Sequence, residues 1–154
     1  MTFMDITIRQ ARFEDIPHLC DLLSDLFSLE SDFEPDPGKQ ASGLERLIND
    51  SIGNSLVLVA VSGRELLGMC SVQTVISTAE GGQVGLVEDV IVRKDRRKTG
   101  IGTRLLSEAV TWCVVKGMSR IQLLADRENK HALKFYYNRF WKETSLICLR
   151  RPLE

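Results

Sequence analysis

The segment Arg96–Leu106, "RRKTGIGTRLL", decides the fold of this chain because it carries a cationic, glycine-rich turn into a helix. Gly100 and Gly102 lower the helix propensity of the first helical turn, at a cost of about 1 kcal/mol each. Small residues at a helix N-terminus also expose backbone N–H groups, which stabilise an anion. Six lysine and arginine residues lie within residues 93–104, against one acid, Asp95. Such a turn predicts a phosphate or pyrophosphate as its ligand.

The sequence on either side of the turn predicts alternating strands and helices. The expected strands cover residues 5–9, 55–63, 66–77, 84–92, 120–126 and 144–151. The expected helices cover residues 13–27, 41–52, the stretch from the turn to about Gly117, and 129–140. The order βααβββαβαβ predicts a mixed α/β fold, in which helices flank both faces of a central sheet. From the length we expect a single domain over residues 1–154.

The composition is that of an ordinary globular protein. Of the 154 residues, 44% are hydrophobic and 27% are charged, and the formal net charge of −1 argues against a nucleic-acid-binding protein. The N-terminus lacks the features of a signal peptide, and no apolar run is long enough to span a membrane. The cysteines and histidines show no metal-ligand spacing, so no metal is expected. We therefore expect a cytoplasmic protein without nucleic-acid or membrane partners.

Other phosphate-binding turns fit the segment poorly. A P-loop ends in GK[ST], which "TGIGTRLL" lacks. The dinucleotide-binding fingerprint has a third glycine where this chain has Leu105, and it belongs to the first strand–helix–strand unit of its domain. A solvated basic surface followed by a glycine cap is the structural alternative.

The pattern Arg97-x-x-Gly100-x-Gly102, after a strand ending in "VIV", resembles the coenzyme-A motif of the GNAT superfamily of N-acetyltransferases. The later stretch "NKHALKFYYNRFWKET" resembles the superfamily's motif in which an asparagine opens a helix that carries A-x-x-F-Y. The matching residues are Asn129, Ala132, Phe135 and Tyr136. The expected order of elements is also that of the superfamily. The resemblance covers nearly the whole chain and is most specific from residue 84 to residue 143.

The resemblance implies that acetyl-CoA binds as a co-substrate. Backbone N–H groups of the central strand would pair with the pantetheine arm and polarise the thioester carbonyl, and those of the turn would hold the pyrophosphate. The acetyl-CoA-binding residues implied in this way are Val90, Ile91, Val92, Arg97, Lys98, Thr99, Gly100, Ile101, Gly102, Thr103, Asn129, Phe135 and Tyr136.

Two catalytic residues are also implied. Tyr136 matches the family's tyrosine, which protonates the departing thiolate; its structural alternative is packing against the coenzyme. A carboxylate must accept the proton of the attacking amine, and Glu88 and Asp89 are neighbours on the central strand, where we expect them to point to opposite faces. Carboxylates within "LVEDVIV" are costly to bury, which favours a role for them. We take Glu88 as the base and Asp89 as the alternative.

Two positions depart from the family pattern. Lys98 occupies a variable position that is often glycine, and Phe140 precedes Trp141 where the family usually has Gly-Phe. Because a glycine there ends the helix in a left-handed turn, we expect this helix to end differently. The loop "SLESDFEPDPG" is either an acidic rim that attracts a cationic amine or a solvated loop; its acids are Glu30, Asp32, Glu34 and Asp36.

We therefore expect an acetyl-CoA-dependent N-acetyltransferase, in which a primary amine attacks the thioester directly in a ternary complex. No cysteine matches a position for an acyl-enzyme route. The acceptor stays unknown, with a small amine preferred over a protein N-terminus or lysine. A coenzyme-A-binding regulatory module without turnover is the alternative. The sequence does not decide whether the protein forms a homodimer.

Overall fold

A computed structural model describes residues 5–30 and 32–153. The chain divides into two compact units, Met1–Gln122 and Leu123–Glu154, and each is described by itself. The expectation of a single domain stays a prediction.

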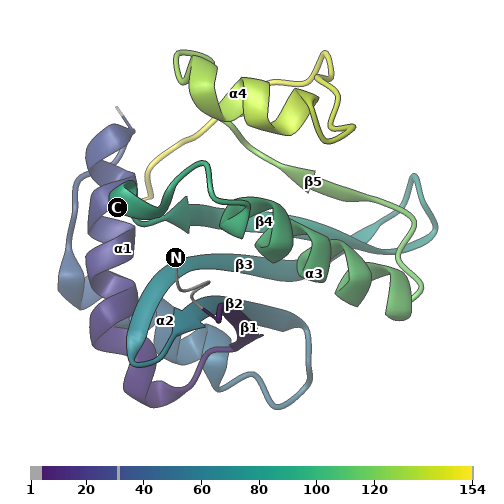
Figure 1. Cartoon of the computed structure of the whole chain (residues 1–154). Coiled ribbons are helices and arrows are strands. Elements are labelled where there is room, and N and C mark those ends of the chain that lie inside the picture. Colours follow the sequence, from purple (N-terminus) through teal and green to yellow (C-terminus); the bar gives the residue numbers. More distant parts are fainter. Residues whose placement is uncertain (1–4, 31, 154) are drawn as a thin grey trace. The chain divides into compact units, whose positions relative to one another are not determined.

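A five-stranded sheet organises the first unit (Figure 1). The strands are β1 (Thr7–Gln10), β2 (Ser55–Ser62), β3 (Glu65–Ser77), β4 (Gly82–Val92) and β5 (Ile121–Leu123), and they lie in this order across the sheet. β1 to β4 pair antiparallel. The connection from β4 to β5 runs through a helix, which makes the sheet mixed. The predicted fold class is therefore confirmed.

The helices of the first unit lie close to their predicted positions. They are the short 3-10 helices η1 (Phe13–Asp15) and η2 (Lys94–Arg96), and the α-helices α1 (Ile16–Leu29), α2 (Pro37–Ile48) and α3 (Ile101–Val115). α2 begins four residues before the predicted start at residue 41. Asp36 caps it by accepting a hydrogen bond from the N–H of Lys39 at 3.1 Å, and Pro37 suits the first helical position.

Helices cover both faces of the sheet. α1 and α2 bury one face in a core cluster that includes Leu19, Leu44, Val59 and Met69. α3 covers the other face at close range, because two strand glycines leave room for it. A Cβ added at Gly85 would lie 2.6 Å from Sγ of Cys113. At Gly68 the added atom would lie 3.2 Å from Cδ1 of Leu105 and 2.9 Å from the C=O of Ile91. These contacts identify the face that Gly68 and Gly85 share.

Gln40 fixes the loop between α1 and α2. Its side chain is buried and donates to the C=O of Cys20 at 2.8 Å and to Oγ of Ser24 at 3.0 Å. Its carbonyl accepts from the N–H of Asp36 at 2.7 Å. A buried amide with its hydrogen bonds made ties the end of this loop to the body of α1.

The second unit contains α4 (Lys130–Tyr137) and an extended C-terminal segment. β5 stops at Leu123 although a strand was predicted to residue 126, because Asp126 begins a turn. Its carboxylate accepts from the N–H of Glu128 at 2.9 Å, and its C=O accepts from the N–H of Asn129. The predicted strand at 144–151 is wrong for the described residues, which form no strand there. Strand propensity depends on pairing with a neighbouring strand, and the described residues after Leu123 contain no strand.

The end of α4 contradicts our expectation of a different helix end. Phe140 adopts a left-handed φ of 68°, the conformation that a glycine would take there. The N–H of Trp141 donates to the C=O of Tyr136 at 3.2 Å, which is the hydrogen bond of a Schellman motif. The phenylalanine thus occupies the usual helix-ending turn and bears the strain of a side chain in it.

Replacing this phenylalanine with glycine tests the strain directly. We expect Phe140→Gly to stabilise the fold by about 0.5–1 kcal/mol, because the relief of left-handed strain exceeds the added chain entropy. Phe140 is 94% exposed, so little packing is lost. Asn138→Gly is the matched control; its φ of −69° gives glycine no advantage, and it should destabilise. Urea denaturation followed by tryptophan fluorescence measures both, and a less stable Phe140→Gly variant would contradict the argument.

Candidate functional site

The turn between β4 and α3 places two residues in the left-handed region. Gly100 precedes α3 with a φ of 87°, and Lys98 has a φ of 62°. Arg97 is extended. Turns of this kind can direct backbone N–H groups to one side, an arrangement suited to an anion. The left-handed Lys98 also gives a physical reason for the glycine that the resembling family often has at this position.

The N-terminus of α3 follows this turn directly. Among the described residues no side chain caps this helix, and the N–H of Arg104 donates to the C=O of Gly100 at 3.1 Å. By helix geometry, the N–H groups of Ile101 and Gly102 have no partner within the helix. Ile101, Gly102 and Thr103 form this first turn, and the Ile101 side chain is buried beneath it. Thr99 braces the turn from outside by donating its hydroxyl to the C=O of Arg96 at 2.5 Å.

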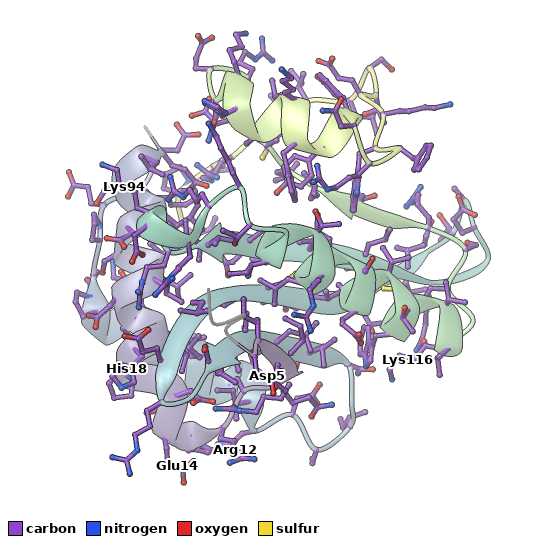
Figure 2. The ribbon with its side chains drawn as sticks, viewed as in Figure 1. Asp5, Arg12, Glu14, His18, Lys94 and Lys116 are labelled. Atoms are coloured by element: carbon purple, nitrogen blue, oxygen red, sulfur yellow. The ribbon has the colours of Figure 1, made fainter. Side chains whose placement is uncertain are left out.

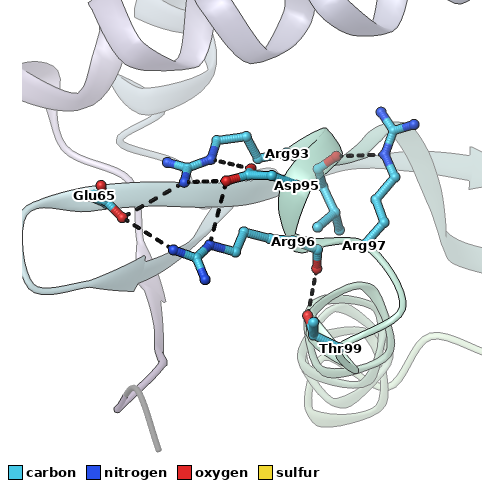
Figure 3. A network of polar contacts seen from close by, with 7 residues as sticks. Glu65, Arg93, Asp95, Arg96, Arg97 and Thr99 are labelled. Atoms are coloured by element: carbon cyan, nitrogen blue, oxygen red, sulfur yellow. Dashed lines mark hydrogen bonds and ion pairs between the residues drawn. The ribbon is translucent and has the colours of Figure 1, made fainter. Parts of the chain in front are cut away.

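Two of the six cations are neutralised within the turn itself (Figure 3). Arg93 donates to both carboxylate oxygens of Asp95, at 2.6 and 2.9 Å, and Arg96 lies 3.8 Å from the same carboxylate. Glu65, at the start of β3, lies 3.8 Å from Arg93 and 3.9 Å from Arg96. Sequence reasoning missed Glu65, because only the register of the sheet brings it to the turn. The cationic excess is therefore smaller than the sequence suggests.

Arg97 joins the turn to the edge of β4. Its Nε donates to the C=O of Val92 at 3.0 Å, as drawn in Figure 3. This single bond uses one of the five guanidinium N–H groups and fixes the direction of the others. The structure thus brings Arg97 into contact with one of the strand residues that the sequence analysis placed in the same site.

The predicted strand residues Val90, Ile91 and Val92 differ in where their N–H groups point. In an antiparallel pair, successive residues face the partner strand and then away from it. Arg93 faces β3, because its N–H donates to the C=O of Leu67 at 2.8 Å. Ile91 therefore also faces β3, whereas Val90 and Val92 face away. The hydrogen bond from Arg97 to the C=O of Val92 is consistent with Val92 facing away from β3. The N–H groups of Val90 and Val92 therefore point to the side of β4 that is away from β3.

A β-bulge separates the two candidate bases. Ser71 lies opposite Asp89, and Val72 lies opposite Val87, so Glu88 is the extra residue on β4. Our expectation of opposite faces assumed regular alternation, which the bulge interrupts. Glu88 is exposed and Asp89 is half-buried.

The Asp89 carboxylate is held by the neighbouring strand. It accepts a hydrogen bond from the Ser71 hydroxyl at 3.0 Å. The backbone N–H of Asp89 donates to the Oγ atom of Ser71 at 3.2 Å. Ser71 is fully buried. The pKa of Asp89 is raised to about 6: burial raises it most, the hydrogen bond from Ser71 lowers it, and the negative charge of Glu88 raises it. Such a carboxyl changes its charge near neutral pH.

In the second unit, Asn129 and the aromatic residues of α4 form one local cluster. Asn129 caps the helix by accepting from the N–H of Ala132 at 3.1 Å. The Tyr136 ring meets those of Phe135 and Trp141 edge-on, at centroid distances of 5.3 and 5.8 Å. These two ring contacts restrict the orientation of the Tyr136 side chain.

Neighbouring residues explain why Tyr137 differs from Tyr136. The Tyr137 hydroxyl donates to Oε2 of Glu143 at 3.0 Å. This hydrogen bond raises the pKa of Tyr137, with smaller contributions from burial and from the charge of Glu143. Its hydroxyl is thus committed to a structural contact.

One of the four acids of the predicted acidic loop, Asp36, has a structural role, because its side chain caps α2. Asp32 and Glu34 are exposed in the same loop.

Figure 2 shows His18 on the outer side of α1, and both histidines are exposed. Within residues 5–30 and 32–153 no three His, Cys, Asp or Glu side chains gather in a way that could hold a metal ion. None of the described helices combines the length and the apolar character that crossing a membrane requires.

Comparison with known proteins points to one family. The sequence model of the acetyltransferase (GNAT) family matches residues 19–140. An uncharacterized N-acetyltransferase of Methanocaldococcus jannaschii is 31% identical over 72 residues, which are 47% of this chain and 32% of that protein. The match thus spans about a third of this relative.

Solved structures agree on the fold. A transcriptional regulator from Bacillus halodurans is 27% identical, with a TM-score of 0.82 over 97% of this chain and 100% of that one. An aminoglycoside N-acetyltransferase in complex with CoA is 16% identical, with a TM-score of 0.81 over 96% and 95% of the two chains. Since the family model covers most of the chain and the cationic turn, the chain belongs to the GNAT family of acetyltransferases.

Proposed function

We propose that the protein transfers the acetyl group of acetyl-CoA to a primary amine by direct attack in a ternary complex. One observation carries this proposal: the uncapped N-terminus of α3, preceded by left-handed Lys98 and Gly100, follows the end of β4, where the C=O of Val92 is turned away from β3 and accepts from Arg97. The first part is suited to a pyrophosphate and the second to a pantetheine amide chain.

The donor would be held mainly by backbone groups. The N–H groups from Arg97 to Thr103 would take the pyrophosphate, and the terminal guanidinium nitrogens of Arg97 would add charge to it. The amides of Val90 and Val92 would bind the pantetheine arm and the thioester oxygen. Donors fixed before the reaction stabilise the oxyanion without reorganising, which is the largest contribution that this chain offers to catalysis.

The reaction needs two proton transfers. The neutral amine attacks the thioester carbon, the tetrahedral intermediate expels the coenzyme thiolate, and the thiolate takes a proton. We assign that proton to Tyr136, as the resemblance implies, with the contacts to Phe135 and Trp141 as support for a fixed ring.

A carboxylate of β4 would accept the proton that the amine loses. We proposed Glu88 from the sequence and kept Asp89 as the alternative. The burial of Asp89, its bond from Ser71 and its pKa of about 6 support Asp89 more than Glu88, because a general base works best with a pKa near the operating pH.

A regulatory coenzyme-A-binding module is the second candidate, favoured by the likeness to a protein described as a transcriptional regulator. It differs from the enzyme in one measurable respect. A regulator binds the coenzyme without releasing free thiol in the presence of any amine, whether small or on a protein.

Binding of the donor can be tested at the turn. Acetyl-CoA at 100 times its Kd should raise the Tm by about 5–10 °C. Gly102→Val should abolish this shift, because a branched side chain would stand among the amides of the first turn. Gly43→Val is the matched control: it also lies within a helix, no atom lies within 4 Å of its added Cβ, and its shift should stay. Failure of millimolar acetyl-CoA to stabilise the wild-type protein would refute the proposed function.

The Asp89 carboxyl predicts a pH dependence of stability. Its folded pKa of about 6 lies above the ordinary value of 3.8, so the fold favours the protonated form. Its contribution is complete below pH 4 and is lost as the pH rises through 6. Asp89→Asn should therefore be more stable than wild type at pH 8, by up to about 3 kcal/mol, and equally stable at pH 4. Urea denaturation at the two pH values measures the difference.

The same variants identify the base. If Asp89 accepts the proton, Asp89→Asn should lower kcat/KM about 100-fold and remove the fall in rate below pH 6. Glu88→Gln should keep that fall in rate. If the fall in rate below pH 6 is instead lost only in Glu88→Gln, Glu88 is the base.

A further inference from the structure

A cavity of about 340 Å³ lies where β3 and β4 meet in their hairpin, beside the start of β5. Its volume is in the range of small-molecule sites. Five of its lining residues are apolar: Val75, Ile76, Ala79, Val84 and Leu86. Val75 and Ile76 are 43% and 69% exposed, unusual values for branched apolar side chains within a strand.

The cavity reaches the face of β4 that carries Asp89. Gly85 faces α3, so its neighbours Val84 and Leu86 face away from α3. Gly68 also faces α3, so Ser71, three residues along β3, faces away, and Asp89 lies opposite Ser71. Leu86 and Asp89 therefore share a face, about 10 Å apart along the strand.

Helix α1 covers only one end of this face. Ile91, two residues after Asp89, belongs to the core cluster with residues of α1. Val84 and Leu86 line the cavity instead. Along this face of β4, Asp89 thus lies between Ile91 of the core cluster and Leu86 of the cavity wall.

The polar end of the cavity holds no free negative charge. Arg120 lies 3.7 Å from Glu80 and donates to Oγ of Ser77 at 3.5 Å, and Ser119 donates to Glu80 at 2.8 Å. None of the nine residues that line the cavity is acidic. A polyamine would therefore find no countercharge for its further cationic groups, and the hydroxyl groups of an amino sugar would lose water against the apolar walls. An aliphatic or aromatic group would instead bury apolar surface.

We propose that this cavity receives the apolar body of the acceptor, and that the acceptor is an aliphatic or aromatic primary amine whose amino group reaches the carboxylates of β4. The proposal rests on the proposed acetyl transfer and narrows its substrate class. The apolar walls select the body of the amine, and Asp89 with Glu88 lies where the amine can lose its proton.

The test compares amines that each carry a primary or sugar amino group on a different body. Thiol release is measured with 2-phenylethylamine, ethylamine, spermidine and glucosamine at saturating acetyl-CoA. We expect kcat/KM for 2-phenylethylamine to exceed each of the others by about tenfold or more. Binding of 2-phenylethylamine to the CoA-saturated protein is measured separately by calorimetry.

Variants at Val75 locate the effect in the cavity. Val75→Ser should raise KM for 2-phenylethylamine about tenfold and leave kcat, KM for ethylamine and KM for acetyl-CoA unchanged. Val75→Asp should supply the missing countercharge and raise kcat/KM for spermidine. Val114→Ser is the matched control, since Val114 is an exposed valine, 66% accessible, on α3 outside the cavity. It should change none of these values.

The outcomes separate the two proposals. Stabilisation by acetyl-CoA together with a preference for spermidine or glucosamine would overturn the apolar acceptor and leave acetyl transfer standing. Absence of 2-phenylethylamine binding, or equal effects of Val75→Ser and Val114→Ser, would also overturn it. A lower mass of Val75→Ser in light scattering would make this face a subunit contact and overturn the cavity's role. Absence of acetyl-CoA binding would instead refute the proposed function itself.

Discussion

The hydrogen bond from Arg97 to the C=O of Val92 joins the two halves of the candidate donor site. It exists because β4 ends with one carbonyl turned away from β3, and because η2 reverses the chain so that Arg97 can reach it. The turn that follows must then enter α3 within a few residues. Lys98 and Gly100 meet this requirement by adopting left-handed conformations, and these conformations expose the amides at the helix start.

Electrostatics supports this arrangement less than the sequence suggests. Asp95 and Glu65 engage Arg93 and Arg96, so two of the six cations of this segment are paired with carboxylates of the protein itself. Directed N–H groups provide an anion site that depends less on net charge than a lysine cluster does, because their positions are fixed by the backbone. This view agrees with a net charge of −1 for the whole chain.

In the proposed reaction, β4 would bind the donor through its edge and accept the proton of the amine on one face. Its edge offers the amides of Val90 and Val92, and its bulge at Glu88 brings Asp89 opposite Ser71. Beyond the bulge, the same face runs into the cavity at the hairpin end. If acetyl transfer and the apolar acceptor both hold, a single strand presents the oxyanion donors, the base and the wall that selects the acceptor.

The sequence by itself determined the strand–turn–helix at β4 and α3, the order of the elements as far as α4, and the family, because apolar periodicity and glycine placement are local properties. The predicted C-terminal strand failed because a strand needs a partner, and local alternation does not supply one. Only the tertiary structure likewise decided that Glu65 lies beside the turn, that Ser71 lies opposite Asp89, and that a bulge forms at Glu88. Each depends on which residue of β3 lies beside which residue of β4, and that register follows from packing across the whole sheet.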